Sequence, residues 1–219
     1  MGQKRAIRGQ QKARRRREIL HSALSAYELY GYETVSMAYL AEKTGLAKGT
    51  LYLYFPTKES LFLVLCEEEL NGWLDAVHES LSGAEGPLGD TTLVDMLVEP
   101  LADHPQLPSL ISMLHTVLER NIDFERARTF RAGLLDHLTA VGRRLDQRVA
   151  HFKPGDGARF MLRVHASLIG FSHVMRPTPI VERVIAGPDY ALYRQDLFEE
   201  LRDSLRIMLL GWRAGSASH

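Results

Sequence analysis

A tight turn between two short helical segments constrains this chain more than any other feature. The residues SMAYLAEKT (36–44) place their apolar side chains on one helical face, and Gly45 follows them directly. After a short turn, KGTLYLYF (48–55) shows the same helical spacing and stops at Pro56. Glycine readily adopts the left-handed backbone conformation that such a turn needs. The pattern predicts a helix-turn-helix, with Ser36 as the N-cap of its first helix.

The rest of the chain is helical in pattern too. Apolar residues recur every three or four positions from Ala13 to Tyr30, and again from the cap Thr57 to Leu81. The same spacing predicts five later helices, at 91–103, 108–122, 124–152, 156–175 and 189–213. The proline- and glycine-rich segments 82–90 and 176–188 are expected to be loops, and a short turn of helix within 176–188 stays open. No stretch has the period of a strand, so the predicted fold class is all-α, with about nine helices.

Composition excludes several classes of protein. The longest apolar run, LFLVLC (61–66), is far shorter than the roughly 18 residues of a membrane-spanning helix, so no membrane partner is expected. The N-terminus lacks the apolar core of a secretory signal, and the single Cys66 forms no intramolecular disulfide, which favours a cytoplasmic protein. No histidine pair has compact metal-ligand spacing, and there is no G-x-S-x-G elbow or Walker loop. We therefore expect no enzyme activity, no metal and no cofactor.

Charge is distributed unevenly along the chain. The formal net charge is zero, but residues 1–60 hold eleven Lys or Arg against five Asp or Glu, and the remainder has the opposite excess. The arm KRAIRGQQKARRRRE (4–18) carries eight positive charges before its first acid. Two interpretations of the arm stay open: a solvated tail, or an extension that follows DNA phosphates or enters the minor groove. The asymmetry predicts a polyanionic partner at one end of the chain.

Two helix starts near the turn carry candidate DNA contacts. Lys48 and Thr50 present hydrogen-bond donors at the start of the second helix of the motif. Gly49 between them has no side chain that would hold the helix away from a groove wall. Lys58 lies at the start of the following helix, where its ammonium and the free backbone N–H groups together favour a phosphate. An ordinary surface position is the alternative for each lysine.

Two tyrosines complete this candidate DNA-binding surface. Tyr52 and Tyr54 each combine an aromatic ring, which can pack on a thymine methyl group, with a hydroxyl that can reach a phosphate oxygen. Tyr52 falls between the core positions Leu51 and Phe55, which favours contact with DNA. Tyr54 lies nearer the inward face, so core packing is a stronger alternative there.

The stretch GYETVSMAYLAEKTGLAKGTLYLYFPTKESLF (31–62) closely resembles the DNA-binding domain of the TetR/AcrR family of bacterial transcriptional regulators. The likeness rests on a glycine-led turn, a Leu-Ala pair in the second helix, KGTLY at 48–52, and Lys-Glu at 58–59. It implies double-stranded DNA as a partner. It also implies a DNA-facing set that consists of Lys48, Gly49, Thr50, Tyr52, Tyr54 and Lys58, with Ser36 capping near the backbone.

Three positions depart from the family pattern. Ala38 stands where the family often has arginine, and Tyr39 stands where a polar residue is frequent. Ala47 replaces the usual capping Ser or Thr of the second helix of the motif. We therefore expect fewer phosphate contacts and a weaker cap on the second helix of the motif. The basic arm is a candidate to compensate for the lost phosphate contacts.

The resemblance implies two domains and a homodimer. Residues 1–60 are assigned to a DNA-binding domain with a basic arm, and 61–219 to a helical effector-binding and dimerisation domain. The helices expected at 156–175 and 189–213 carry more apolar residues than one inward face requires, as a dimer interface would. Two-fold symmetry implies a palindromic operator.

Polarisable and aromatic residues on the apolar stripes of the body are candidates to line a pocket for a small apolar or amphipathic effector. They are Met96, Met113, His115, Phe130, Leu134, Met161, His165 and Phe171. Core packing is the alternative for each of them. The predicted function is a DNA-binding transcriptional regulator that acts as a ligand-responsive repressor. The effector, the operator sequence, and the choice between repression and activation stay open, as does a DNA-binding protein without an effector.

Overall fold

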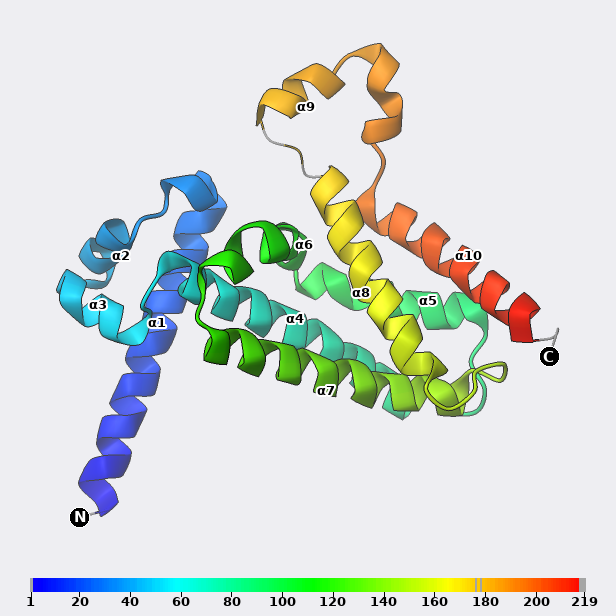
Figure 1. Ribbon diagram of the computed structural model, residues 1–219, viewed down its shortest axis with the longest axis horizontal. Coiled ribbons are helices and arrows are strands. Elements are labelled where there is room, and N and C mark those ends of the chain that lie inside the picture. Colours follow the sequence, from blue (N-terminus) through cyan, green and yellow to red (C-terminus); the bar gives the residue numbers. More distant parts are fainter. Residues whose placement is uncertain (1, 176, 178, 217–219) are drawn as a thin grey trace. The chain divides into compact units, whose positions relative to one another are not determined.

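The computed structural model describes residues 2–175, 177 and 179–216. Helices are the only regular elements over these residues, which confirms the all-α class (Figure 1). Ten of them are α-helices, close to the predicted nine. No helix in this part of the chain is long and apolar enough to cross a membrane. The chain forms two compact units: one comprises residues up to 65 together with 115–123, and the other comprises 66–114 and 124 onwards.

Besides residues 115–123, the first unit contains four α-helical segments. They are α1 (Gly2–Thr34), α2 (Met37–Thr44), α3 (Lys48–Tyr54) and the start of α4 (Lys58–Gly83). Their fully buried apolar residues include Ile19, Leu40, Leu51 and Phe62, which form one core. The ring of Phe62 lies edge-on to the rings of Tyr27 and Tyr32, with centroids 5.5 and 4.9 Å apart, so aromatic packing joins α4 to α1.

The helix α1 extends beyond the predicted 13–30 at both ends. Its N-terminal part includes the basic arm, so the backbone of the arm is helical from Gly2. Near its other end, Gly31 has a φ of 74° and interrupts the regular helical backbone. This conformation is strained for other residues. Gly31 therefore interrupts the helix where the stop was predicted, although three more residues follow in the helical segment.

The predicted cap of α4 is present as a reciprocal pair. The Ser60 backbone N–H donates to the Thr57 hydroxyl over 2.9 Å, and the Thr57 N–H donates to the Ser60 hydroxyl over 3.2 Å. Two backbone donors at the start of α4 are thus satisfied locally, in the manner of a capping box.

The second unit contains the rest of α4 and six further α-helices. These are α5 (Asp90–Val98), α6 (Leu107–Ser112), α7 (Phe124–Arg148), α8 (Asp156–Met175), α9 (Pro179–Ile185) and α10 (Leu197–Ser216). The indole of Trp73 on α4 is fully buried, and its N–H donates to the Leu97 carbonyl of α5 over 2.9 Å. This bond satisfies the one polar group of a large core side chain.

Several predicted helices are shorter or interrupted. The segment 91–103 changes at Val98 into the 3-10 helix η1 (Glu99–Asp103), because Pro100 has no N–H to donate to an α-helical carbonyl. The segment 108–122 divides into α6, a π-helical turn η2 (Leu114–Leu118) and a 3-10 turn η3 (Glu119–Asn121). These two predictions of continuous α-helices were wrong.

The C-terminal predictions also need correction. The helix expected at 189–213 divides into η4 (Pro188–Tyr193) and α10, because the Asp196 carboxylate accepts the N–H groups of Phe198 and Glu199 and so begins a new helix. Within 176–188, the short helical turn that the prediction left open is present as the helix α9, which forms a hairpin with η4 that projects from the second unit (Figure 1). The helix expected at 124–152 ends at Arg148, whose carbonyl accepts the N–H of Leu88.

The crossing of α7 and α8 is unusually close. A Cβ atom at Gly157 of α8 would lie 2.0 Å from the Gly142 carbonyl oxygen of α7, and a Cβ at Gly142 would lie 2.4 Å from the Ala158 nitrogen. The Asp146 carboxylate also accepts the N–H groups of Gly155 and Gly157 over 2.7 Å each. Glycine at both crossing positions therefore permits backbone contact between the two helices.

Candidate DNA-binding site

The turn between α2 and α3 is held by local hydrogen bonds. The Ser36 hydroxyl accepts the N–H of Tyr39 over 3.1 Å, which confirms the predicted N-cap. Gly45 has a φ of 65°, and its N–H donates to the Glu42 carbonyl over 3.1 Å. The next N–H, of Leu46, donates to the Ala41 carbonyl over 2.9 Å. These bonds end α2 and fix the direction in which α3 begins.

The helix α3 turns most of the predicted DNA-facing residues outward. Lys48, Gly49 and Tyr52 are exposed, whereas Thr50 is half-buried. Leu51 is fully buried and attaches the helix to the core. Ala47 stands at the N-cap position without a side-chain hydrogen bond, as its departure from the family pattern predicted. The start of α3 therefore has free backbone N–H groups next to Lys48.

Tyr54 faces the basic arm of α1. It is half-buried, and it lines a hollow of about 590 Å³ whose other lining residues are Gln11, Lys12, Arg14, Arg15 and Glu18. Arg14 and Arg15 both donate to the Glu18 carboxylate, over 3.0 and 2.7 Å. The structure thus brings one predicted contact, Tyr54, together with three cations of the arm.

Lys58 has partners within the protein. Its ammonium donates to the Tyr32 carbonyl over 2.9 Å and lies 3.8 Å from the centroid of the Tyr32 ring. The Tyr32 hydroxyl donates to the Glu59 carboxylate over 3.0 Å, and burial together with that carboxylate raises the pKa of Tyr32 above its usual value. Lys58 therefore also caps the end of α1, a structural role that sequence reasoning missed.

Two other side chains of this unit were absent from the predicted set. The guanidinium carbon of Arg16 lies 5.2 Å from the centroid of the Phe55 ring, so the arm packs against the end of α3. Leu53 on α3 is 81% exposed although it is apolar. Its signal in the sequence was its position four residues after Gly49, on the face opposite Leu51.

The structure separates the predicted effector residues into three groups. Four of them are buried in the second unit: Phe130, Leu134, Met161 and His165. Met96, Met113 and Phe171 are half-buried there. His115 belongs to the first unit, and its ring nitrogen Nδ1 lies 2.7 Å from the Glu119 carboxylate. The eight residues are therefore not all members of one unit, whereas the prediction placed them around one pocket.

Phe171 lines an apolar hollow of about 530 Å³. The other apolar side chains around it are Val174 and Met175 of α8 with Leu192 and Tyr193 of η4. The polar lining consists of Ser167 on α8, Gln195 between η4 and α10, and Glu200 and Ser204 on α10. The hollow can accept an apolar group beside a few hydrogen-bonding groups.

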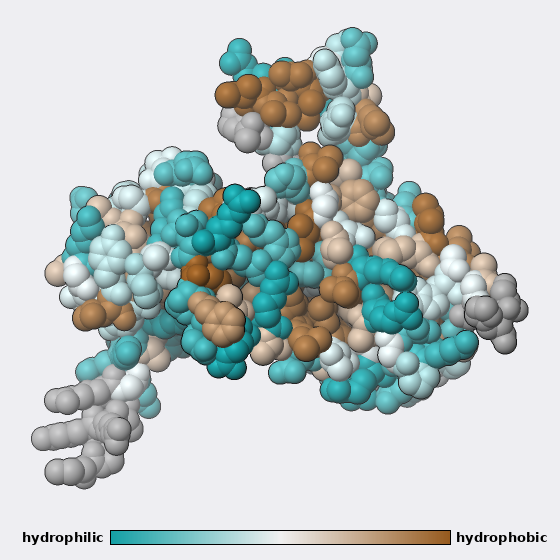
Figure 2. Space-filling view, viewed as in Figure 1, coloured by the Kyte–Doolittle hydropathy of each residue, from teal (hydrophilic) through white to brown (hydrophobic). Residues whose placement is uncertain are grey.

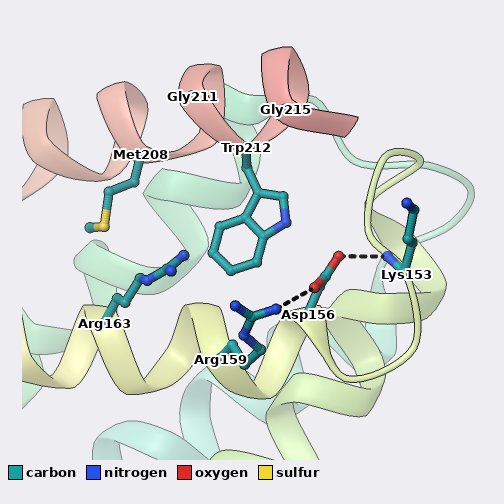
Figure 3. Close-up of a pocket in the computed structure, with 8 residues that line it drawn as sticks. All are labelled: Lys153, Asp156, Arg159, Arg163, Met208, Gly211, Trp212 and Gly215. Atoms are coloured by element: carbon teal, nitrogen blue, oxygen red, sulfur yellow. Dashed lines mark hydrogen bonds and ion pairs between the residues drawn. The ribbon is translucent and has the colours of Figure 1, made fainter. Parts of the chain in front are cut away.

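A second hollow of about 560 Å³, also between α8 and α10, is basic (Figure 3). Arg159 and Arg163 point from α8 toward the indole of Trp212, with guanidinium carbons 5.8 and 4.4 Å from its ring centroid. Asp156 accepts the backbone N–H of Lys153, and this bond lowers the pKa of the Asp156 carboxyl. Two guanidiniums beside one carboxylate leave this hollow suited to an anionic group.

The α2–α3 turn and the outward-facing α3 define a helix-turn-helix protein, and its second unit is helical as well. Residues 19–65 match the family described as "Bacterial regulatory proteins, tetR family", and residues 67–216 match "Tetracyclin repressor-like, C-terminal domain". The chain therefore belongs to the TetR family of bacterial regulatory proteins.

The chain is similar to curated regulators over part of its length. It is 25% identical over 99 residues to the HTH-type transcriptional regulator RutR of Escherichia coli K12, covering 45% of this chain and 47% of RutR. It is 28% identical over 126 residues to the HTH-type transcriptional repressor AcnR of Corynebacterium glutamicum, covering 58% of this chain and 59% of AcnR. The chain thus spans about half the length of these relatives.

The fold extends over nearly the whole chain of a solved relative. FadR from Thermus thermophilus, a TetR-family transcriptional repressor in complex with lauroyl-CoA, is 22% identical with a TM-score of 0.58. The likeness covers 89% of this chain and 93% of that protein. At this identity it shows the shared fold alone.

Proposed function

We propose that this protein is a ligand-responsive transcriptional repressor that binds a palindromic operator as a homodimer. The observation that carries the proposal is the α2–α3 turn, which fixes α3 by local bonds and leaves Lys48, Gly49 and Tyr52 exposed. Exposed donors on a short helix after such a turn suit the major groove, whereas the arginine-rich arm suits phosphates. The positive excess of residues 1–60 supports the same partner.

The proposed dimer uses α8 and α10. Both helices carry large apolar side chains that are more than half exposed in the single chain: Leu162 and Val174 on α8, and Ile207 and Leu210 on α10. Figure 2 shows apolar side chains, drawn in brown, along these helices and on α9. A second copy of the chain would cover such a face and give two α3 helices related by two-fold symmetry.

The proposed effector is an amphipathic small molecule. The apolar hollow beside Phe171 and the basic hollow beside Trp212 offer sites for an apolar group and an anionic group. Lauroyl-CoA, which the relative from Thermus thermophilus binds, combines both kinds of group. Both hollows border α8 and α10, so a ligand there would act on the proposed dimer face and, through it, on the separation of the two α3 helices.

Selection of binding sites from random DNA duplexes tests the proposal. We expect one palindromic sequence, retained at a salt concentration that removes non-specific binding. A thermal-shift screen with fatty acids and acyl-CoA thioesters of different chain lengths then tests the effector. A ligand that stabilises the protein should weaken operator binding, and the operator should weaken ligand binding by the same factor. Selection without any enriched sequence would refute the repressor, and an operator without any ligand would leave a regulator that has no effector.

A further inference from the structure

The centre of the exposed face of α3 is apolar. Successive residues of an α-helix lie about 100° apart around its axis, so Gly49 and Leu53 each lie about 160° from the buried Leu51. Lys48 and Tyr52 fall on one flank of this face, and Thr50 falls on the other. The two residues that point most directly away from the core are therefore a glycine and a leucine, neither of which has a polar side chain.

Leu53 is unusual in its exposure. At 81% it has the largest exposed fraction among the large apolar side chains of the described residues. A single exposed leucine elsewhere would need no explanation. Here it stands at the centre of the helix face that the proposed function places in the major groove, so its contacts in the complex are with base edges.

Gly49 leaves room beside this leucine. It lies one helical turn before Leu53 on the same face, and a Cβ atom added to Gly49 would meet no other atom within 4 Å. Packing within the protein therefore does not require glycine at this position. The absence of a side chain instead lets a base edge approach the backbone next to Leu53.

Leucine recognises only one kind of group in the major groove. The C5-methyl group of thymine is the apolar group that the four bases display there, and the other positions display donors or acceptors. A leucine cannot pair with a donor or acceptor, and covering one without a partner costs free energy. From this geometry, and resting on the proposed function, we infer that Leu53 reads the C5-methyl group of a thymine in each operator half-site.

The test removes single methyl groups from the operator. Each thymine of the selected operator is replaced in turn by uracil, symmetrically in both half-sites, and the affinity is measured. For the wild-type protein we expect a loss of about fourfold per half-site at one position or at two adjacent positions, because burial of one methyl group contributes about this factor. Replacing that thymine by 5-methylcytosine should retain more affinity than replacing it by cytosine, because only the former keeps the methyl group.

Two variants identify the side chain. Leu53→Ala should bind the thymine and uracil operators equally at that position and keep the effects at other positions. Leu29→Ala is the matched control, because Leu29 is also an exposed leucine, at 72%, but lies on α1. It should keep the full discrimination between thymine and uracil. Thermal melting of both variants should match the wild type, since neither side chain belongs to the core.

The outcomes separate this inference from the proposed function. If the protein selects an operator but no thymine-to-uracil replacement depends on Leu53, the inference is wrong and operator binding stands. If 5-methylcytosine and cytosine are equivalent at the sensitive position, recognition there uses the thymine O4 acceptor, and the inference is also wrong. If no operator is selected at all, it is the proposed function that fails.

Discussion

Lys48 and Lys58 differ in what their ammonium groups already contact. Lys48 is exposed at the start of α3, beside backbone N–H groups that no side chain caps. The ammonium of Lys58 donates to the Tyr32 carbonyl and lies against the Tyr32 ring. Lys48 is therefore available to a base edge. Lys58 is held close to the start of α4, as a phosphate contact would require.

Replacing each lysine by alanine should separate these two roles. Lys58→Ala should weaken operator and scrambled duplexes alike and reduce the salt slope by about one for each half-site. It should also lower the melting temperature, because the end of α1 loses a cap.

Lys48→Ala should weaken operator binding by about 1–3 kcal/mol at one base position and leave binding to scrambled DNA nearly unchanged. Salt titrations on both duplexes measure this, and equal weakening by Lys48→Ala would assign base recognition to other residues.

Among the helices, α7 and α8 depend most directly on two glycines. Gly142 and Gly157 allow the two backbones to touch, and the loop that follows α7 is tied to Asp146. The same loop and the first turns of α8 position Asp156 and Arg159 in the basic hollow. Close packing at this crossing therefore also determines the geometry of a candidate ligand site.

Gly157→Ala should destabilise the fold by about 1–3 kcal/mol, because its Cβ would overlap the Gly142 carbonyl and force the helices apart. Gly133→Ala on α7 is the control, since a Cβ there meets open space, and it should be neutral or stabilising by up to about 1 kcal/mol. Urea unfolding of both variants measures the difference. Equal stability of the two variants would contradict the importance of this crossing.

At the scale of the whole molecule, the proposed dimer would cover the exposed apolar side chains of α8 and α10. Four large apolar side chains on these two helices are more than half exposed in the single chain, and the fully buried part of an interface is where such side chains gather. The formal net charge of zero gives no long-range repulsion between two copies. The proposed palindromic operator also requires two α3 helices in one particle.

Ile207→Glu should convert the dimer into a monomer, because it places a charge in the middle of the proposed interface. Phe124→Glu is the control, since Phe124 is equally apolar and 77% exposed but lies on α7. Sedimentation at micromolar concentration should show a dimer for the wild type and for the control. A monomeric wild type, with or without operator, or a dimeric Ile207→Glu variant, would reject the α8–α10 interface.

The all-α class and the detailed form of the α2–α3 turn follow from the order of the residues alone. The cap at Ser36, the left-handed Gly45, the missing cap at Ala47 and the capping of α4 by Thr57 were all predicted correctly. Each depends on hydrogen bonds between residues at most a few positions apart, so residue types in order are enough to specify it. The resemblance to the TetR family rests on the same stretch, because it too is a pattern of residue types in order.

Features that join residues distant in the sequence, in contrast, are visible only in the folded chain. The engagement of Lys58 by Tyr32 spans 26 positions, and the inclusion of 115–123 in the first unit joins segments still further apart. The hairpin of α9 and η4 depends on Arg194, which donates to the carbonyls of Ile185 and Gly187. Helical periodicity records which face of a segment is buried, but it does not specify the partner against which that face packs, because many partners satisfy the same apolar stripe.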